Sequence, residues 1–442
     1  MNRKILGGAG AIAASMFAAM PAWAQEAAAA APVPNPGNNA WMMTSTVLVM
    51  MMILPGLALF YGGLTRSKNM LSTMTQVGAA AALAMLLWVI YGYSTAFGPE
   101  GNAFFSWGNL FLANTTPDST AATFTDGVVI NEYVFIAFQM TFAAITAGLV
   151  FGATVERMKF AAAMVFVIVW STIVYYPIAH MVWAGQGLLF NWSPAALDFA
   201  GGTVVHINAG VSALVACLIL GKRKGYPAEP MPPHSLTLTM VGTGLLWVGW
   251  FGFNAGSALE ANGSAGLALI NTFVATASAG LFWMLAEKFS GHKGSALGFC
   301  SGIVAGLVAV TPAAGNSGPF GAIVLGAVAS VICFFMVSKV KPAIGYDDSL
   351  DAFGIHGVGG IVGAIGTGIV FSPALGGPGG DDFAMGPQVM TQIIAVLISV
   401  VWAGVGTAIA IYVAKLLTGL RVSEEVENSG LDIGEHGERA YN

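Results

Sequence analysis

Two histidines stand inside otherwise apolar stretches, where an ionisable side chain needs an explanation. His206 lies in "GGTVVHINAG" (201–210) and His356 in "FGIHGVGG" (353–360). Ionisable residues within a membrane are costly and point to function by default. The pair could ligate a haem or another metal, relay protons, or line a narrow pore and hydrogen-bond to a small polar solute. Two separately satisfied buried histidines are the alternative without function.

An aspartate precedes each histidine by eight residues. "DFAGGTVVH" runs from Asp198 to His206, and "DSLDAFGIH" runs from Asp348 to His356. Eight helical residues rise about 12 Å, so each Asp would stand at the start of a helix. A carboxylate there caps free backbone N–H groups. We favour this structural interpretation over direct contact with a cation, although Asp198 could also act on a nearby cation through its field.

Aromatic residues and one hydroxyl recur in the apolar stretches. An aromatic face attracts a cation by about 0.5–2 kcal/mol, and a serine oxygen can accept a hydrogen bond from an N–H donor. Ammonium would satisfy both, although aromatic pairs four residues apart are also typical of a packed core. The residues concerned are Phe138 and Phe142 in "YVFIAFQMTF" (133–142), Trp250, Phe253 and Ser257 in "WFGFNAGS" (250–257), and Trp183, which we expect in a connection.

The composition indicates a membrane protein. The 442 residues are 56% hydrophobic and only 8% charged, with a mean hydropathy of +0.75, whereas soluble domains carry about 25% charged residues. The net charge of −5 gives no basic stripe for nucleic acid. The three cysteines, Cys217, Cys300 and Cys333, lie in apolar runs. We expect them to be buried thiols rather than a disulfide framework.

Eleven stretches are long and apolar enough to cross a membrane, which takes roughly 20 residues of helix. We therefore expect an all-α polytopic membrane protein with 11 transmembrane helices between residues 41 and 416. They run near 41–62, 70–93, 128–152, 160–178, 200–220, 236–256, 265–287, 296–311, 319–338, 353–371 and 388–416.

The basic residues predict the orientation. Beyond residue 24, Lys and Arg occur in every second connection or in the tail, and the intervening connections contain none. The positive-inside rule then places the N-terminus outside and the C-terminus inside. The outer connections carry Asp and Glu, so that face should attract cations, unless it lacks bases only to satisfy the topology.

The two histidine segments also predict an internal repeat. The fifth helix starts outside and the tenth starts inside, so the histidines approach the midplane from opposite faces. An inverted repeat would match helices 1–5 (about 41–220) with helices 6–10 (about 236–371) and leave the eleventh, 388–416, over. Glycine-rich runs such as "GVGGIVGAIGTG" (357–368) allow such helices to pack closely.

The N-terminal residues form a separate unit. Residues 1–24 have the basic start, apolar centre and A-x-A-like end of a secretory signal peptide; a short first transmembrane helix is the alternative. Residues 25–40 then read as a flexible exported N-terminus.

Several strings, in order, resemble the Amt ammonium transporters of the Amt/Mep/Rh superfamily, in particular the bacterial AmtB-like members. The resemblance runs from about Trp41 into the tail and departs around 113–127 and in the signal peptide. The strings are "PGLALFYGGL", "AFQMTF", "PIAHMVW", "LDFAGGTVVHINAG", "WFGFNAGSA", "GLVAVTPAAG" and "DAFGIHGVGG".

This resemblance implies a role for each candidate residue. It implies an outer ammonium-binding site beneath which a stacked gate leads to a hydrophobic pore with two histidines. It also implies a homotrimer with one pore per subunit, and neither an enzyme nor a protein with a cofactor or metal. The binding residues would be Phe138, Trp183 and Ser257 with Asp198 nearby, the gate Phe142 and Phe253, and the pore histidines His206 and His356.

The expected activity is ammonium uptake through the inner (plasma) membrane for nitrogen assimilation. The ion would lose its proton in the apolar pore, and ammonia would cross while the proton passes along the histidine pair. The tail, 417–442, reads by its residues as a solvated cytoplasmic extension. The resemblance implies that it is regulatory and contacts neighbouring subunits and a PII signal-transduction protein.

Two other functions stay open. The chain could be an ammonium sensor that signals to cytoplasmic partners, but it ends about 25 residues after its last predicted helix, which favours transport. It could also be a bis-histidine haem protein, which visible absorbance would reveal.

Overall fold

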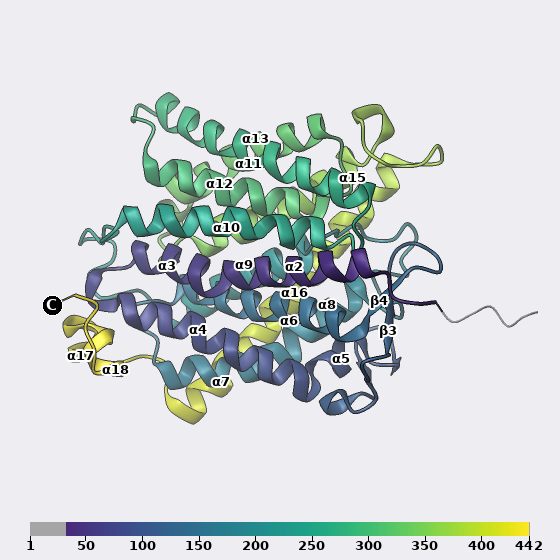
Figure 1. Ribbon diagram of the computed structural model, residues 1–442. Helices are drawn as coiled ribbons and strands as arrows, with labels where there is room; N and C mark the ends of the chain where they lie inside the picture. The colour runs from purple at the N-terminus through teal and green to yellow at the C-terminus, as the bar shows by residue number, and fades with distance from the viewer. Residues whose placement is uncertain (1–31, 442) are drawn as a thin grey trace, which may run out of the picture.

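The computed structural model describes residues 32–441, in which eleven long apolar helices form one bundle (Figure 1). This confirms the predicted number of membrane-crossing helices and the all-α class. The predicted signal peptide, residues 1–24, lies outside the described residues.

The first half of the bundle holds five crossings. Their elements are α2 (Pro36–Met51), η1 (Met52–Leu57) and α3 (Ala58–Leu64); η2 (Ser67–Asn69), α4 (Met70–Leu87), η3 (Trp88–Gly92) and α5 (Tyr93–Phe97); α6 (Glu132–Val150) and η5 (Phe151–Ala153); α7 (Phe160–Trp170), η6 (Ser171–Tyr175) and α8 (Tyr176–Trp183); η7 (Gly202–Ile207) and α9 (Asn208–Leu220).

The second half and the last helix hold six. Their elements are α10 (Leu236–Gly256); α11 (Gly263–Phe289); α12 (Ala296–Val310) and η8 (Thr311–Ala313); α13 (Pro319–Phe335), η9 (Met336–Val340) and α14 (Lys341–Ile344); η10 (Phe353–Gly357) and α15 (Val358–Val370); and α16 (Met385–Thr418). Most crossings extend a few residues beyond their predicted bounds.

Several crossings are interrupted by a π-helical turn, a feature frequent at functional sites. One such turn, η1, contains Pro55, which has no backbone N–H and cannot continue a regular helix. The turns η7 and η10 contain His206 and His356, so the two candidate pore residues sit at equivalent irregularities of the two halves.

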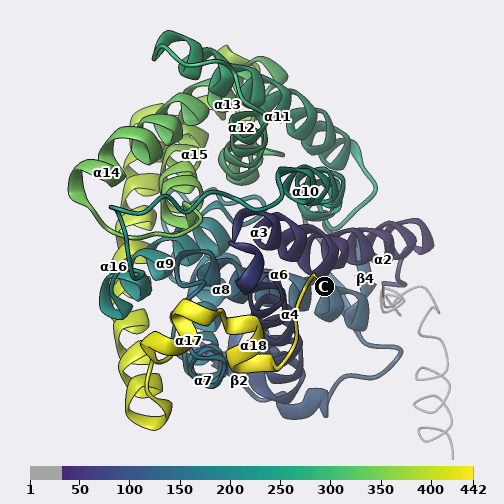
Figure 2. The ribbon, with the colours of Figure 1, turned by 90° about the vertical axis from the view of Figure 1, so that its left-hand side faces the viewer.

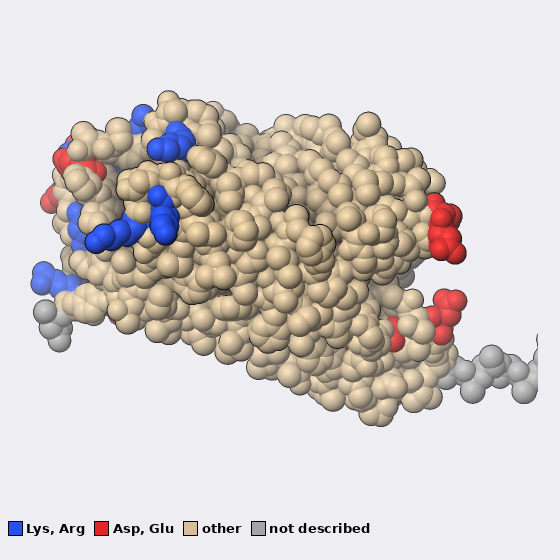
Figure 3. Space-filling model, turned by 90° about the horizontal axis from the view of Figure 1, so that it is seen from above, with Lys and Arg blue, Asp and Glu red and all other residues tan. Residues whose placement is uncertain are grey.

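The charged residues separate to the two ends of the bundle. Every Lys and Arg in residues 32–441 lies at the end formed by α3, α14 and the tail, here called the basic end. The opposite, acidic end carries acidic side chains and no base. On the face seen in Figure 3, a wide band without charge separates the two groups, as a lipid-embedded surface requires.

Connections at the acidic end contain short structures that the sequence analysis did not anticipate. Two antiparallel strand pairs form in the connection between α5 and α6, which also holds the turn η4 (Leu110–Leu112), and the turn η11 (Pro373–Leu375) lies between α15 and α16. The pairs are β1 (Glu100–Gly101) with β2 (Ser106–Trp107) and β3 (Thr120–Ala122) with β4 (Val129–Asn131).

A buried ion cluster fixes the connections at the basic end. Arg223 pairs with Asp347 at 2.8 Å and with Glu156 at 3.2 Å, and Arg66 also pairs with Glu156. Burial alone would raise the pKa of Glu156 and Asp347, but hydrogen bonds and attraction from the arginines outweigh it and hold both pKa values below their usual range. The cluster therefore joins four separate connections.

The tail packs against the basic end, where α17 (Glu424–Ser429) and α18 (Leu431–His436) lie beside α4 and α7 (Figure 2). Asp432 accepts hydrogen bonds from the backbone N–H groups of Leu71 and Ser72 at the start of α4. Leu431 has no exposed surface. The expectation of a solvated extension is therefore wrong, because acidic side chains of the tail cap a helix that lacks its own cap.

Candidate functional site

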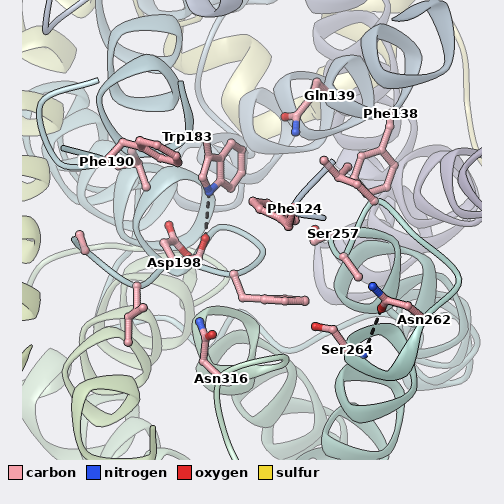
Figure 4. A pocket seen from close by; sticks show the side chains of 16 residues that line it. Phe124, Phe138, Gln139, Trp183, Phe190, Asp198, Ser257, Asn262, Ser264 and Asn316 are labelled. Atoms are coloured by element: carbon pink, nitrogen blue, oxygen red, sulfur yellow. Dashed lines mark hydrogen bonds between the residues drawn. The ribbon is translucent and has the colours of Figure 1, made fainter. Parts of the chain in front are cut away.

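A cavity of about 310 Å³ opens at the acidic end of the bundle (Figure 4). Four residues singled out in the sequence, Phe138, Trp183, Asp198 and Ser257, all line it. They come from different crossings and connections, so the fold brings together residues that are spread over more than a hundred positions of the sequence. The cavity is further lined by Phe124, Gln139, Val182, Phe190, Ala196, Leu197, Phe199, Ala258, Leu259, Asn262, Ser264 and Asn316.

Two of the aromatic residues that line the cavity, Phe138 and Trp183, are held by helices. Phe138 and Phe142 project from successive turns of α6, whose start is capped by Asn131 accepting from the N–H of Tyr133. Trp183 is the last residue of α8 rather than part of a connection, which corrects the sequence-based placement. Its position at a helix end gives the indole a defined direction at the cavity wall.

Asp198 organises the cavity wall through the backbone. Its carboxylate accepts hydrogen bonds from four consecutive N–H groups, Gly201 to Val204, at 2.6–3.1 Å, which caps η7. Gly201 adopts φ 112°, which favours glycine. The main-chain oxygen of Asp198 accepts from the Trp183 indole N–H at 2.9 Å.

The capping interpretation of Asp198 is thus confirmed. Burial raises the pKa of Asp198, while the four backbone donors oppose that rise. Both carboxylate oxygens are occupied by the start of η7, so the side chain holds η7 in place, while the main-chain oxygen orients Trp183.

Two polar groups at the cavity have free acceptor capacity. The Ser257 hydroxyl donates to the Phe253 carbonyl at 2.8 Å, so its oxygen lone pairs remain available to an N–H donor. The Gln139 amide oxygen is buried and has no hydrogen-bond partner within residues 32–441. Sequence reasoning missed Gln139, although a glutamine inside the apolar string "AFQMTF" is itself a signal.

Beneath the cavity, two stacked phenylalanines separate it from the histidine pair. The rings of Phe142 and Phe253 stack with centroids 4.1 Å apart and planes inclined by 22°. Both side chains are almost fully buried. The Phe142 ring also meets Phe138 at 4.9 Å and Trp183 at 5.7 Å, so the aromatic cavity and the stack form one continuous array.

The histidine pair lies directly beyond this stack. The His206 ring is 6.0 Å from Phe253 and 5.3 Å from Trp250, and it stacks with His356 at 5.4 Å. The two Nδ1 atoms are 3.3 Å apart. For two neutral rings, one Nδ1 must donate and the other accept, so one proton lies on Nδ1 of one ring and the other on Nε2 of its partner.

The space around the histidines is narrow and apolar. A cavity of about 10 Å³ remains there, near the limit for one water-sized molecule. Its lining is hydrocarbon and aromatic apart from the two imidazoles: Met52, Leu57, Phe60, Ile145, Leu149, Val205, Leu246, Trp250, Phe253 and Val304. The buried Nε2 of His206 has no partner within the described residues.

Matched local structure brings the histidines together. Asp348 caps its segment as Asp198 does, accepting from the N–H groups of Ala352 and Phe353. The segments enter from opposite ends, α9 packing on η10 and α15 on η7. These paired features agree with the predicted inverted repeat.

Comparison with known proteins shows which family this chain resembles. The model of the Ammonium Transporter Family matches residues 40–441. The ammonium transporter of Aquifex aeolicus is 48% identical over 413 residues, which cover 92% of this chain and 93% of that protein.

Solved structures show the same fold. The crystal structure of Candida albicans Mep2 is 35% identical and superposes with a TM-score of 0.80, covering 89% of this chain and 87% of that one. A structure titled a sensor Amt protein is 26% identical, with a TM-score of 0.82 and coverage of 90% and 98%. With its aromatic cavity, phenylalanine stack and histidine pair on this fold, the chain belongs to the ammonium transporter family, a family of transporters rather than enzymes.

Proposed function

We propose that this protein transports ammonium by binding the cation in the cavity at the acidic end, removing its proton, and conducting ammonia past the histidine pair. The observation that carries the proposal is the unbroken sequence of ring contacts from Phe138 through Phe142 and Phe253 to His206. It joins a cavity suited to a cation to a passage suited to a neutral molecule.

The cavity favours a small cation with N–H donors. Its aromatic faces attract positive charge, and no Lys or Arg among residues 32–441 lines it. The free lone pairs of Ser257 and the unpartnered amide oxygen of Gln139 can accept N–H groups. Ammonium presents four donors, whereas potassium presents none, so hydrogen bonding discriminates between two ions of similar size.

The passage beyond the phenylalanines disfavours the charged form. A bare cation placed among hydrocarbon side chains loses its hydration and gains little in return. Ammonium can escape this penalty by releasing a proton, and potassium cannot. Selectivity then follows from chemistry as well as from binding.

The histidine pair can carry the released proton. One Nε2 bears a hydrogen and the other a lone pair, and the Nδ1 atoms are within hydrogen-bond reach of each other. A proton accepted at one Nε2 shifts the shared Nδ1 proton, and the second ring releases its own. Ammonia and a proton together then move one positive charge per turnover.

The charge distribution supports an orientation in the inner (plasma) membrane. Under the positive-inside rule, the basic end faces the cytoplasm and the acidic end, with its cavity, faces outward. The N-terminus would then be outside and the C-terminus inside, and uptake would supply nitrogen metabolism. A thiol reagent that cannot cross the membrane tests this orientation. It should label the variant Asp126→Cys only from outside and the variant Lys293→Cys only from inside, and the reverse pattern would contradict the orientation.

The homotrimer and the PII partner remain predictions from the resemblance. In their support, the tail forms a structured surface at the basic end through α17 and α18. Native mass spectrometry of the full chain measures the subunit number. PII binding should be lost on removal of residues 419–442, and equal binding without them would count against that role.

Proteoliposomes test the proposed function directly. An ammonium pulse should give a saturable current that an equal potassium pulse does not. Equal currents from both ions would contradict selective transport. No current, together with no ammonia-driven change in a pH-sensitive dye, would contradict transport altogether.

A further inference from the structure

A hairpin outside the helical bundle adds one more aromatic residue to the cavity at the acidic end. The strands β3 and β4 pair antiparallel, and Phe124 lies in the turn between them. Phe124 lines the cavity although its side chain is 71% exposed.

The turn that carries Phe124 is held by hydrogen bonds on both sides. The backbone N–H and the hydroxyl of Thr123 both donate to the carbonyl of Val128, at 3.1 and 3.0 Å. The N–H of Val128 donates to Thr125 at 3.0 Å. Phe124 therefore occupies a defined turn rather than a free loop.

The hairpin is also joined to the helix that carries the binding residues. Strand β4 ends at Asn131, which caps α6, the helix of Phe138 and Phe142. The Asn131 side chain also donates to the Pro117 carbonyl, and the Glu132 N–H donates to Ser119. Phe124 thus keeps a fixed relation to the inner aromatic residues.

The surroundings of Phe124 suit a cation. Figure 4 shows its side chain between Trp183 on one side and Ser257 with Phe138 on the other. The cavity volume of about 310 Å³ is roughly ten times the share of one water molecule in the liquid. Phe138, Trp183 and Ser257 therefore leave room for an ion with part of its hydration shell. An aromatic face at the mouth of the cavity would contact that partly hydrated ion.

We propose that Phe124 is a further substrate-binding residue, whose ring gives an outer π face that holds the ammonium cation at the cavity mouth before it reaches Phe138, Trp183 and Ser257. This inference rests on the proposed function and extends it. The chemistry asks for an aromatic ring rather than any large apolar side chain, because the attraction comes from the ring quadrupole.

The test separates aromaticity from size. Phe124→Leu removes the π face and keeps a large apolar group, whereas Phe124→Tyr keeps the face. Phe111→Leu is the matched control, because Phe111 is similarly exposed in the same connection but does not line the cavity. The half-saturating ammonium concentration and the maximal current are measured in proteoliposomes for all three and for the wild type.

We expect Phe124→Leu to raise the half-saturating concentration about two- to fivefold, the range of an exposed cation–π contact, with the maximal current unchanged. Phe124→Tyr and Phe111→Leu should match the wild type. An unshifted Phe124→Leu, or an equal shift in Phe111→Leu, would overturn the proposal. A fall in maximal current alone would assign Phe124 a structural role instead.

Calorimetric titration with methylammonium in detergent separates this proposal from the proposed function, because it measures binding without transport. The dissociation constant should rise by the same factor in Phe124→Leu. An identical constant in both proteins would overturn the role of Phe124 even if no current is recorded. A wild type that binds methylammonium but gives neither a current nor a change in the pH-sensitive dye would contradict transport alone.

Discussion

The Nδ1 atoms of His206 and His356 lie 3.3 Å apart although 150 residues separate the two histidines. Their segments meet where Gly210 faces Gly357: a Cβ on Gly210 would lie 2.1 Å from the Gly357 backbone nitrogen. Such close backbone approach is possible only without side chains. The histidine contact therefore depends on a glycine contact one turn away.

Gly210→Ala should accordingly separate the two histidines. The added methyl group must displace η10, at about 1–3 kcal/mol of stability, and we expect ammonium current to fall by roughly tenfold or more. Gly266→Ala is the control, because a Cβ there meets nothing within 4 Å. Wild-type current and melting temperature in Gly210→Ala would show that the close approach is not required.

Asp198→Asn should loosen the wall of the outer cavity. An amide has one acceptor oxygen, so some of the four N–H groups now bound by the carboxylate lose their partner. We expect about 1–3 kcal/mol of destabilisation, together with a higher half-saturating ammonium concentration because Trp183 is held by the Asp198 carbonyl. Thermal unfolding and transport measure the two effects.

The exposed Asp118 offers the matching control for this change, since its carboxylate caps no helix. Asp118→Asn should leave both measurements at their wild-type values. If Asp198→Asn behaved in the same way, the capping role would be refuted.

Removing Arg223 should destabilise the protein in a pH-dependent way. The pKa values of Glu156 and Asp347 are lowered in the fold, so their stabilising contribution is present above the unfolded value of about 4 and is lost as the pH falls. Arg223→Gln removes the 2.8 Å partner of Asp347 and leaves Glu156 paired with Arg66 alone, at about 3–5 kcal/mol near pH 7. Protonation relieves that penalty, so the difference from wild type should shrink towards pH 4.

Thermal unfolding in detergent between pH 4 and 8 measures this difference. Lys224→Gln is the neighbouring control, because Lys224 pairs with an exposed Glu424 and should have little effect at any pH. A difference between Arg223→Gln and wild type that stays constant with pH would argue against the coupling.

Glu427→Gln should release the tail. The carboxylate of Glu427 pairs with Arg421 at 2.7 Å and accepts from the backbone N–H of Lys224 at 2.7 Å. With these contacts weakened, trypsin should cleave at Arg421 several times faster, since proteolysis follows the open population. Glu425→Gln, at an exposed neighbour, should be cleaved like the wild type, and so should Glu427→Gln if the tail docks by other means.

The fold was predictable from the sequence to the extent that lipid imposes it. Hydrocarbon thickness and the cost of charge set the number of crossings, and hence all eleven helices. The stacking of Phe142 on Phe253 and the meeting of His206 with His356 followed the motifs. The ends of helices were less predictable. The predicted crossing ends at residue 178, whereas α8 continues to Trp183, and the local composition does not indicate this extension.

Other features depend on contacts between distant segments. Gln139 stands out in the sequence as a polar residue in an apolar string, but only the structure shows that its amide oxygen has no partner within the described residues and that it lines the cavity. The composition of the tail predicts a polar, solvated segment. In the structure, however, Asp432 accepts a hydrogen bond from the backbone N–H of Ser72 in α4, 360 residues away. Nothing in the sequence sets Phe124 apart, because only the pairing of β3 with β4 brings it to the cavity.

Transport through the histidine pair is tested best by the ammonium-evoked current of proteoliposomes that contain wild type, His206→Leu or His292→Leu, each beside a potassium pulse. We expect a saturable, ammonium-specific current in the wild type and in His292→Leu, whose histidine is exposed. We expect His206→Leu to lose that current or its selectivity over potassium. An unchanged, selective current in His206→Leu would contradict a proton relay through the histidine pair.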